Sequence, residues 1–185
     1  LDVFYGRLSH GDQLLLGSKM VGRKLGANFD LSRSIETFSS SPDPGRDSPE
    51  WEKVTRARLQ NLAPPKVVLW AWSSHVGRPD RGGSPDYANA TLAKLEKLES
   101  DFPEVCFVYF TGPAQGWVGA SEYDQNNAII RRFARDKSKV LFDFEDFDVF
   151  APDGGLQMDG TDKCEWCEEW CQSHDCSMLD DNKTC

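Results

Sequence analysis

The chain has 185 residues, of which 39% are hydrophobic, and a formal net charge of −9. That length and composition are typical of one globular domain with a single substantial core. The acidic balance argues against a nucleic-acid partner, whose phosphates are bound by clustered Lys and Arg. No apolar run approaches the roughly 18 residues of a membrane span, so no span is predicted.

The first element is a short apolar strand, Val3 to Tyr5, which runs into a glycine and then into Ser9. A helix-like run from Asp12 to Val21 follows. In an open parallel α/β sheet, ligands bind where the carboxyl ends of the strands leave the sheet. Ser9 is therefore a candidate nucleophile. The alternative is that Ser9 only caps the helix that follows it.

The middle of the chain alternates between two patterns. Continuous apolar runs predict strands that are buried on both faces, at residues 67–72, 105–111 and 140–144. Amphipathic patterns predict helices at residues 49–62, 86–101 and 121–136. Loops are expected at residues 39–47 and 78–85. Strands separated by single helices predict a parallel sheet with helices on both faces.

The end of the chain is rich in cysteine. The six cysteines are Cys106, Cys164, Cys167, Cys171, Cys176 and Cys185, and sequons place candidate glycosylation sites at Asn89 and Asn182. Crowded cysteines with sequons favour a secreted, disulfide-bonded protein. If all six pair, at least one bridge must join Cys106 to the tail. Zinc is the competing interpretation, because Cys164, Cys167 and Cys171 share one helical face.

One domain and an appended tail follow from this change of pattern. Residues 1–150 form the predicted α/β domain, and residues 151–185 form a cysteine-rich tail that packs on it. An acidic run, Asp143 to Asp148, is either a calcium site or a solvated strand end, and the second is more typical. Trp70 and Trp72 lie in a buried strand pattern and belong to the core. Trp117, in a glycine-rich segment, is the candidate for exposure at a site.

An ordered series of blocks identifies a family resemblance. The series runs from the first strand and Ser-x-Gly through Trp-Ala-Trp-Ser-Ser, Phe-Val-Tyr-Phe-Thr-Gly and Val-Leu-Phe-Asp-Phe to Pro-Asp-Gly at residues 152–154. It resembles the SGNH (GDSL-like) hydrolase superfamily, in a divergent branch, over roughly residues 1–155. The resemblance implies a three-layer α/β/α domain with a flavodoxin-like parallel sheet, and hydrolysis of esters.

The resemblance also assigns roles to residues. Ser9 matches the nucleophile, and the Ser9 N–H, Gly26 and Ser74 match the oxyanion donors. His75 and Trp117 are expected to contact substrate. The chain departs from the family pattern at Leu156, which stands where a histidine is expected. His174 is then the candidate base, unless the base lies in sequence beyond this chain.

Two functions therefore remain open. One is a secreted serine esterase that deacylates a carbohydrate, with an ester or glycan as its partner and no cofactor or metal ion. The other is a catalytically silent extracellular module with a structural, self-assembling or glycan-binding role. The retained Ser9 favours the first, and the missing histidine favours the second.

Overall fold

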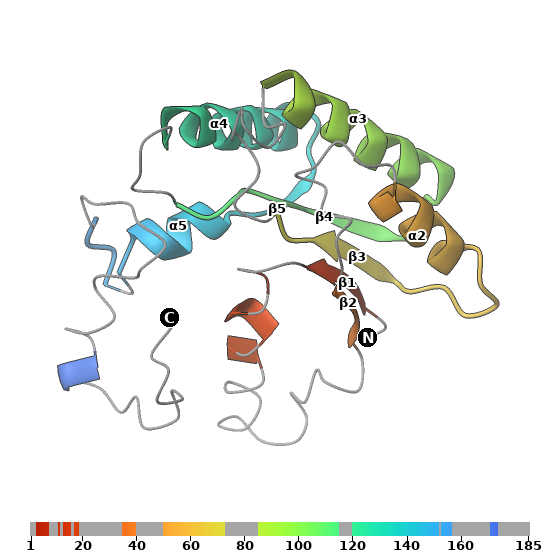
Figure 1. Cartoon of the computed structure of the whole chain (residues 1–185), viewed down its shortest axis with the longest axis horizontal. Coiled ribbons are helices and arrows are strands. Elements are labelled where there is room, and N and C mark those ends of the chain that lie inside the picture. The colour runs from red at the N-terminus through yellow and green to blue at the C-terminus, as the bar shows by residue number, and fades with distance from the viewer. Residues whose placement is uncertain are drawn as a thin grey trace.

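The computed structural model describes residues 3–7, 11, 13–15, 17–18, 35–39, 50–72, 85–114, 120–151, 153–156 and 171–173. Within these residues the chain forms one parallel sheet with helices packed against it (Figure 1). None of the described helices has both the length and the apolar character needed to cross a membrane.

The sheet has five strands in the order β2-β1-β3-β4-β5, and every neighbouring pair is parallel. Their bounds are Val3–Arg7 for β1, Ile35–Ser39 for β2, Val67–Trp70 for β3, Cys106–Phe110 for β4 and Val140–Phe142 for β5. The order 2-1-3-4-5 is that of flavodoxin-like folds. The predicted fold class is therefore confirmed.

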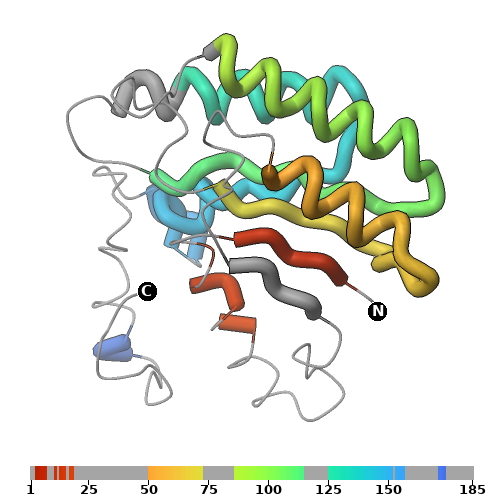
Figure 2. The backbone as a smooth tube through the Cα atoms, turned by 45° about the vertical axis from the view of Figure 1, so that its right-hand side comes forward, coloured from red at the N-terminus to blue at the C-terminus, as the bar shows by residue number. Residues whose placement is uncertain are grey.

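The helices lie on the two faces of the sheet as right-handed crossovers require. The steps from β2 to β3, β4 and β5 all run in one direction across the sheet, and their helices cover one face (Figures 1 and 2). These are α2 (Glu50–Leu59), α3 (Pro85–Asp101) and α4 (Ala120–Asp136). The step from β1 to β2 runs the other way, and helical residues between 11 and 18 lie on the opposite face.

Alternation along the strands sends successive side chains to these two faces. Trp70 contacts both Phe4 of β1 and Trp51 of α2, with ring centroids 6.0 Å apart in each pair. The Trp70 indole N–H donates to Thr55 Oγ1 at 2.9 Å, so a hydrogen bond fixes the orientation of this buried side chain. A Cβ on Gly6 would lie 2.2 Å from the Trp70 ring, so the close approach of β1 and β3 requires glycine there.

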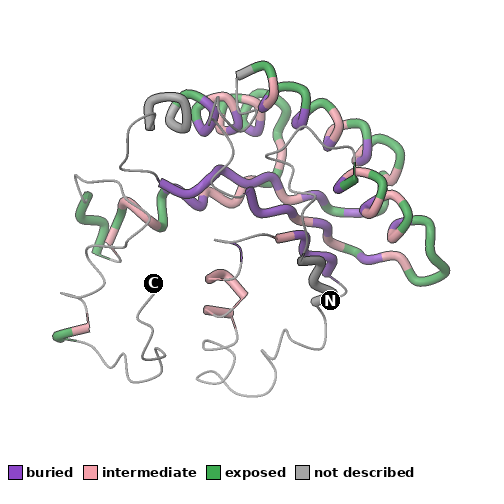
Figure 3. The backbone as a smooth tube through the Cα atoms, viewed as in Figure 1, coloured by how far each residue is buried: buried purple, intermediate pink, exposed green. Residues whose placement is uncertain are grey.

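The opposite face carries a row of aromatic rings. Tyr5 stacks on Phe110 at 6.4 Å, and Phe110 stacks on Phe142 at 4.8 Å. Phe142 then contacts Phe144 and Phe147 of α5 (Phe144–Val149). Burial is deepest along the strands between the two helical layers (Figure 3). Trp70 and Trp72 are buried, as predicted.

Two elements were not predicted. The strand β2 falls in a segment for which the sequence analysis assigned no strand, and α5 replaces what was interpreted as an acidic strand end. The strands predicted at residues 67–72, 105–111 and 140–144 and the helices predicted at residues 49–62, 86–101 and 121–136 are present, with ends that differ by up to three residues. The strand predicted from Val3 to Tyr5 extends to Arg7. Of the helix-like run from Asp12 to Val21, the structure describes only residues 13–15 and 17–18, which are helical.

Candidate functional site

The direction of the strand order reverses at β1, which lies between β2 and β3. In such sheets the crevice outside the carboxyl ends of the strands at the reversal is where ligands bind. The β1–β3 ladder continues past the strands, since the Ala71 N–H donates to the Gly6 carbonyl at 3.0 Å. The candidate site therefore lies where the chain leaves Arg7 and Trp72.

The residues assigned to this site from the sequence, Ser9, Gly26, Ser74, His75, Trp117 and His174, all lie outside the described residues. What the structure describes is the ends of the elements that lead to them. Ser9 follows the last residue of β1 by two positions, and Ser74 follows Trp72 by two positions. These assignments remain predictions.

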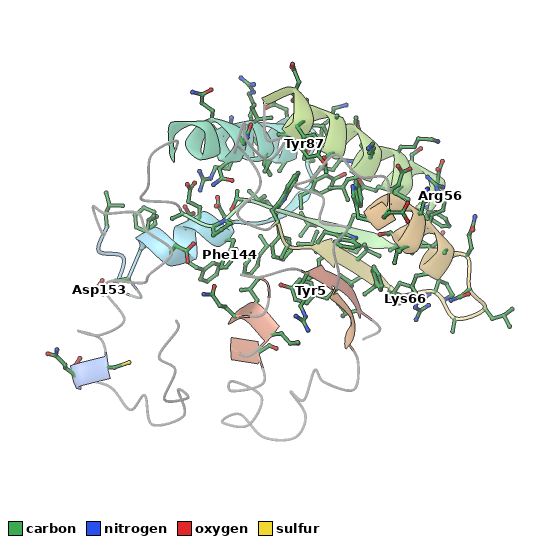
Figure 4. All side chains as sticks on the ribbon, viewed as in Figure 1. Tyr5, Arg56, Lys66, Tyr87, Phe144 and Asp153 are labelled. Atoms are coloured by element: carbon green, nitrogen blue, oxygen red, sulfur yellow. The ribbon has the colours of Figure 1, made fainter. Side chains whose placement is uncertain are left out.

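Tyr5 connects β1 to the helical residues that follow it. Its hydroxyl donates to the Gly11 carbonyl at 2.9 Å, in a buried position (Figure 4 labels Tyr5). Burial raises the pKa of Tyr5 well above its usual range, and the nearby Arg7 charge only partly offsets this. The phenol therefore stays neutral and keeps the proton that it donates to the Gly11 carbonyl. This contact links β1 to Gly11, the first described residue after the strand.

The β4 exit segment, residues 111–114, is held by side chains from two helices. Asn127 of α4 accepts from the Gly112 N–H at 2.7 Å and donates to the Gly112 carbonyl at 3.2 Å. Asp148 of α5 accepts from the Ala114 N–H at 2.8 Å. All four residues of the segment are buried. Two backbone N–H groups at this edge are thus already used, so they are not free to bind an oxyanion.

The Thr111 side chain joins the exit segment to the end of β5. Its hydroxyl donates to Asp143 Oδ1 at 3.0 Å and accepts from the Glu145 N–H at 3.1 Å. The backbone N–H groups in the first turn of a helix have no partner within the helix. In α5 one of them, the Glu145 N–H, is hydrogen-bonded to Thr111 at the end of β4. This hydroxyl and the Thr111 N–H, which donates to the Phe142 carbonyl at 3.3 Å, join the carboxyl ends of β4 and β5.

Arg131 of α4 forms ion pairs with the acidic residues at the start of α5. It donates to both oxygens of Asp143, at 2.6 and 2.7 Å, and lies 2.7 Å from Glu145 and 3.2 Å from Asp146. The hydrogen bonds to Asp143 raise the pKa of Arg131 above its usual range, with burial opposing them. We call these four residues the Arg131 cluster.

This arrangement decides between the two interpretations of the acidic run. Three of its carboxylates face a guanidinium and a fourth, Asp148, holds a backbone N–H. Within the described part of the chain, no group of three or more His, Cys, Asp or Glu residues is arranged to hold a metal ion. The run is a structural connection between α4, β4 and α5.

The loop at Asp153 to Leu156 closes on itself. Asp153 accepts from the Gly155 N–H at 2.8 Å, and the Ala151 N–H donates to the Gly155 carbonyl at 2.9 Å. Gly154 has a φ of +86°, a conformation that favours glycine. Leu156, at the position where the family resemblance expects histidine, is 57% exposed.

The cysteines differ from the expectation of complete pairing. Cys106 is an exposed free thiol, so its predicted disulfide to the tail is wrong. It begins β4 at the amino edge of the sheet, whereas the chain leads toward the tail from the carboxyl edge, beyond α5. Cys171 is disulfide-bonded, and the other four cysteines lie outside the described residues.

The two sequons remain predictions. Asn89 is exposed on α3, and Asn182 lies outside the described residues.

The sequence analysis missed Asn127 and Arg131 as supports of the site. One signal was available, because two adjacent asparagines precede the apolar Ile129 and Ile130 in a helical pattern. Asparagine is unfavourable inside a helix, so a pair on the buried side indicates a specific contact.

No protein-family model matches the sequence, and no curated protein sequence does. Solved structures are similar in fold. A GDSL-like lipase from Bacteroides thetaiotaomicron superposes with a TM-score of 0.56 at 14% identity, over 86% of this chain and 77% of that one. The acetyl xylan esterase AlAXEase has a TM-score of 0.53 at 14% identity, over 78% and 77% of the two chains. AlinE4, an SGNH-hydrolase family esterase, has a TM-score of 0.52 at 16% identity, over 93% and 92%.

The similarity extends over most of each chain, and it agrees with the strand order and the layers described above. The sequence resemblance to SGNH hydrolases is thus matched by an independent comparison of structures. The chain has the SGNH-hydrolase fold.

Proposed function

We propose that the chain is a serine esterase with Ser9 as its nucleophile. One observation carries the proposal: in a sheet with the SGNH-hydrolase fold, β1 ends two residues before Ser9 and lies beside β3 at the reversal of strand order. A ligand in that crevice meets the ends of both strands. The fold neighbours, a GDSL-like lipase and two esterases, support the reaction class.

The reaction follows from the roles of these groups. The Ser9 hydroxyl attacks the ester carbonyl carbon while a histidine removes its proton. The N–H groups of Ser9 and Gly26 and the Ser74 hydroxyl stabilise the oxyanion. Collapse of the intermediate expels the alcohol, which takes the proton, and water then hydrolyses the acyl-serine. His174 is proposed as the base.

The finer proposals concern substrate and location. An acylated carbohydrate is the proposed substrate, supported by a fold neighbour that is an acetyl xylan esterase, with His75 and Trp117 as the contacts of this chain. Secretion is proposed from the cysteine-rich tail and the sequons, and Cys171 is disulfide-bonded.

A second function is favoured by the loop at Asp153 to Leu156. The Asp153 carboxylate is occupied by the Gly155 N–H, and leucine stands at the histidine position. That loop therefore supplies no histidine to act as the base. A catalytically silent extracellular module is the function this observation supports.

Fluorophosphonate labelling followed by intact mass separates the two. The reagent needs an activated serine, whose oxygen displaces fluoride from phosphorus. The esterase predicts one adduct on the wild-type chain and none on Ser9→Ala. His174→Ala should slow labelling by about 100-fold or more if its imidazole is the base. A folded wild-type chain without an adduct would establish the silent module.

A further inference from the structure

Three large apolar side chains are exposed together at the end of α5 and in the loop after it. Phe147 is 58% exposed, Phe150 is 42% exposed and Leu156 is 57% exposed. The Phe150 N–H still donates to the Asp146 carbonyl at 2.9 Å, so Phe150 follows Phe147 by about one helical turn and lies on the same side of α5. Phe150 and Leu156 are partners in an antiparallel bridge, which places their side chains next to each other. We call these three residues the apolar patch.

The apolar patch is held by the structure beneath it. The Phe147 ring stacks on Phe142 of β5, with ring centroids 5.0 Å apart and planes 13° apart. In the loop that leads to Leu156, both the N–H and the carbonyl of Gly155 are hydrogen-bonded within the loop. A surface that is already ordered loses little conformational entropy when it binds. A contiguous exposed apolar patch with a polar rim is typical of a surface that binds a partner.

The rim of the apolar patch is acidic. Residues 140–156 contain five Asp or Glu residues and no Lys or Arg. Arg131 pairs with three of the five carboxylates, so one guanidinium serves three negative charges, and the Asp146 side chain remains 54% exposed. Asp153 is also exposed, and the backbone N–H that it binds carries no full charge to offset its own. We call Asp146 and Asp153 the acidic rim. A partner with positive charge beside its apolar side chains complements this surface.

A second copy of the chain does not meet this requirement. Pairing two such surfaces would bring like charges together, and each chain has a net charge of −9. We propose that the apolar patch and its acidic rim bind a segment of a partner protein in which Lys and Arg flank apolar side chains. The apolar patch supplies the contact area, and the acidic rim attracts the basic groups. Such binding does not require the proposed esterase activity.

Fluorescence anisotropy on the full chain tests the apolar contact. The probe is a dye-labelled amphipathic helical peptide made of Leu and Lys, and its counterpart has Glu in place of every Lys. We expect the chain to bind the Lys peptide and not the Glu peptide. Phe147→Ser should weaken binding by about tenfold, as the loss of a central apolar contact does. If Phe147→Ser does not fold, Leu156→Ser is judged by the same criterion.

The matched control for the apolar contact is Leu62→Ser. Leu62 is another fully exposed apolar side chain, in the loop after α2. That loop lies at the opposite end of the molecule from α5 (Figure 1). Leu62→Ser should therefore bind the Lys peptide as tightly as the wild type does.

The acidic rim is tested by Asp153→Asn. Asparagine keeps an oxygen that can accept from the Gly155 N–H, but it removes the charge. We expect binding to be about twofold to threefold weaker at low salt, and the difference from the wild type to disappear at high salt. Asp136→Asn is the matched control, because Asp136 is an exposed carboxylate at the end of α4, and this variant should bind as the wild type does.

The proposal is wrong if the chain does not bind the Lys peptide, or if it binds the Glu peptide equally well. It is also wrong if Phe147→Ser binds as tightly as Leu62→Ser, because the peptide then attaches to negative charge elsewhere on the chain. Sedimentation of the same proteins tests the second copy. A wild-type dimer that Phe147→Ser dissociates would overturn the proposal and assign the apolar patch to self-association.

Discussion

The ring and the hydroxyl of Tyr5 make different contacts. Its ring belongs to the aromatic row between β1 and β5, and its hydroxyl reaches the backbone at Gly11. Because the phenol is buried, the charged form is disfavoured and the proton is retained in the folded chain. The same burial raises the pKa of Tyr109, whose hydroxyl donates to the Glu99 carboxylate.

Because the pKa of Tyr5 and of Tyr109 is raised on folding, the free energy of unfolding should decrease at alkaline pH. The pKa of Tyr5 is raised on folding, so its contribution is complete below about pH 10, where the unfolded tyrosine also keeps its proton. Above that pH the unfolded chain loses the proton first, and stability falls by up to about 1.4 kcal/mol per pH unit for each such tyrosine. Chemical unfolding from pH 8 to 11.5 should show this fall.

Tyr5→Phe tests the assignment. We expect a loss of about 1 kcal/mol at pH 7, from the hydrogen bond to Gly11, and a shallower fall above pH 10 than in the wild type. Tyr109→Phe is the parallel variant and should also make the alkaline fall shallower. An alkaline slope that is the same in wild type and Tyr5→Phe would contradict the prediction.

At the scale of elements, the central strands were predictable because they are buried on both faces and so read as continuous apolar runs. The strand β2 was not, since it is an edge strand whose sequence, Ile-Glu-Thr-Phe-Ser, has neither a continuous apolar run nor apolar residues at every second position, and only its pairing with β1 establishes it. The helix α5 was not, because its start depends on Thr111, a residue 34 positions away from Glu145.

The site was predictable only in part, for the same physical reason. Sequence order places Ser9 and Ser74 after strands, and the parallel topology brings those strand ends to one edge. The supports of that edge are contacts between distant positions, such as Asn127 with Gly112 and Asp148 with Ala114. No local pattern encodes such pairs.

The Arg131 cluster is the contact on which α4, β5 and α5 converge. Arg131→Met should destabilise the chain by about 2 kcal/mol at pH 7, less than a fully buried pair would lose, because the Arg131 side chain is 32% exposed. The loss arises from carboxylates left without their cation.

Arg131→Lys is the control for charge alone. Lysine keeps the positive charge but cannot make the paired hydrogen bonds to both Asp143 oxygens, so an intermediate loss of about 1 kcal/mol is expected. Urea unfolding of the three proteins measures both differences. A Met variant as stable as the wild type would show that the cluster contributes no net stability.

On the scale of the whole molecule, the two edges of the sheet differ in chemistry. The carboxyl edge carries the candidate site and the polar network, and the amino edge carries the thiol of Cys106. We expect Cys106 to react with a maleimide in the folded, unreduced chain, giving an adduct that peptide mapping assigns to Cys106 and that is absent from Cys106→Ser. Peptide mapping that finds Cys106 in a disulfide would contradict this.

The central position of β1 also affects when the sheet can fold during synthesis of the chain. Val3 pairs with both Ile35 and Val67, so the first strand of the chain receives its second neighbour only after more than sixty further residues. Contacts so distant in sequence slow folding, because the intervening loop must close before they contribute. During synthesis, the crevice beside β1 therefore cannot exist until β3 has left the ribosome. β4 and β5 follow β3 in the sequence, so they can join the sheet only after the crevice beside β1 can form.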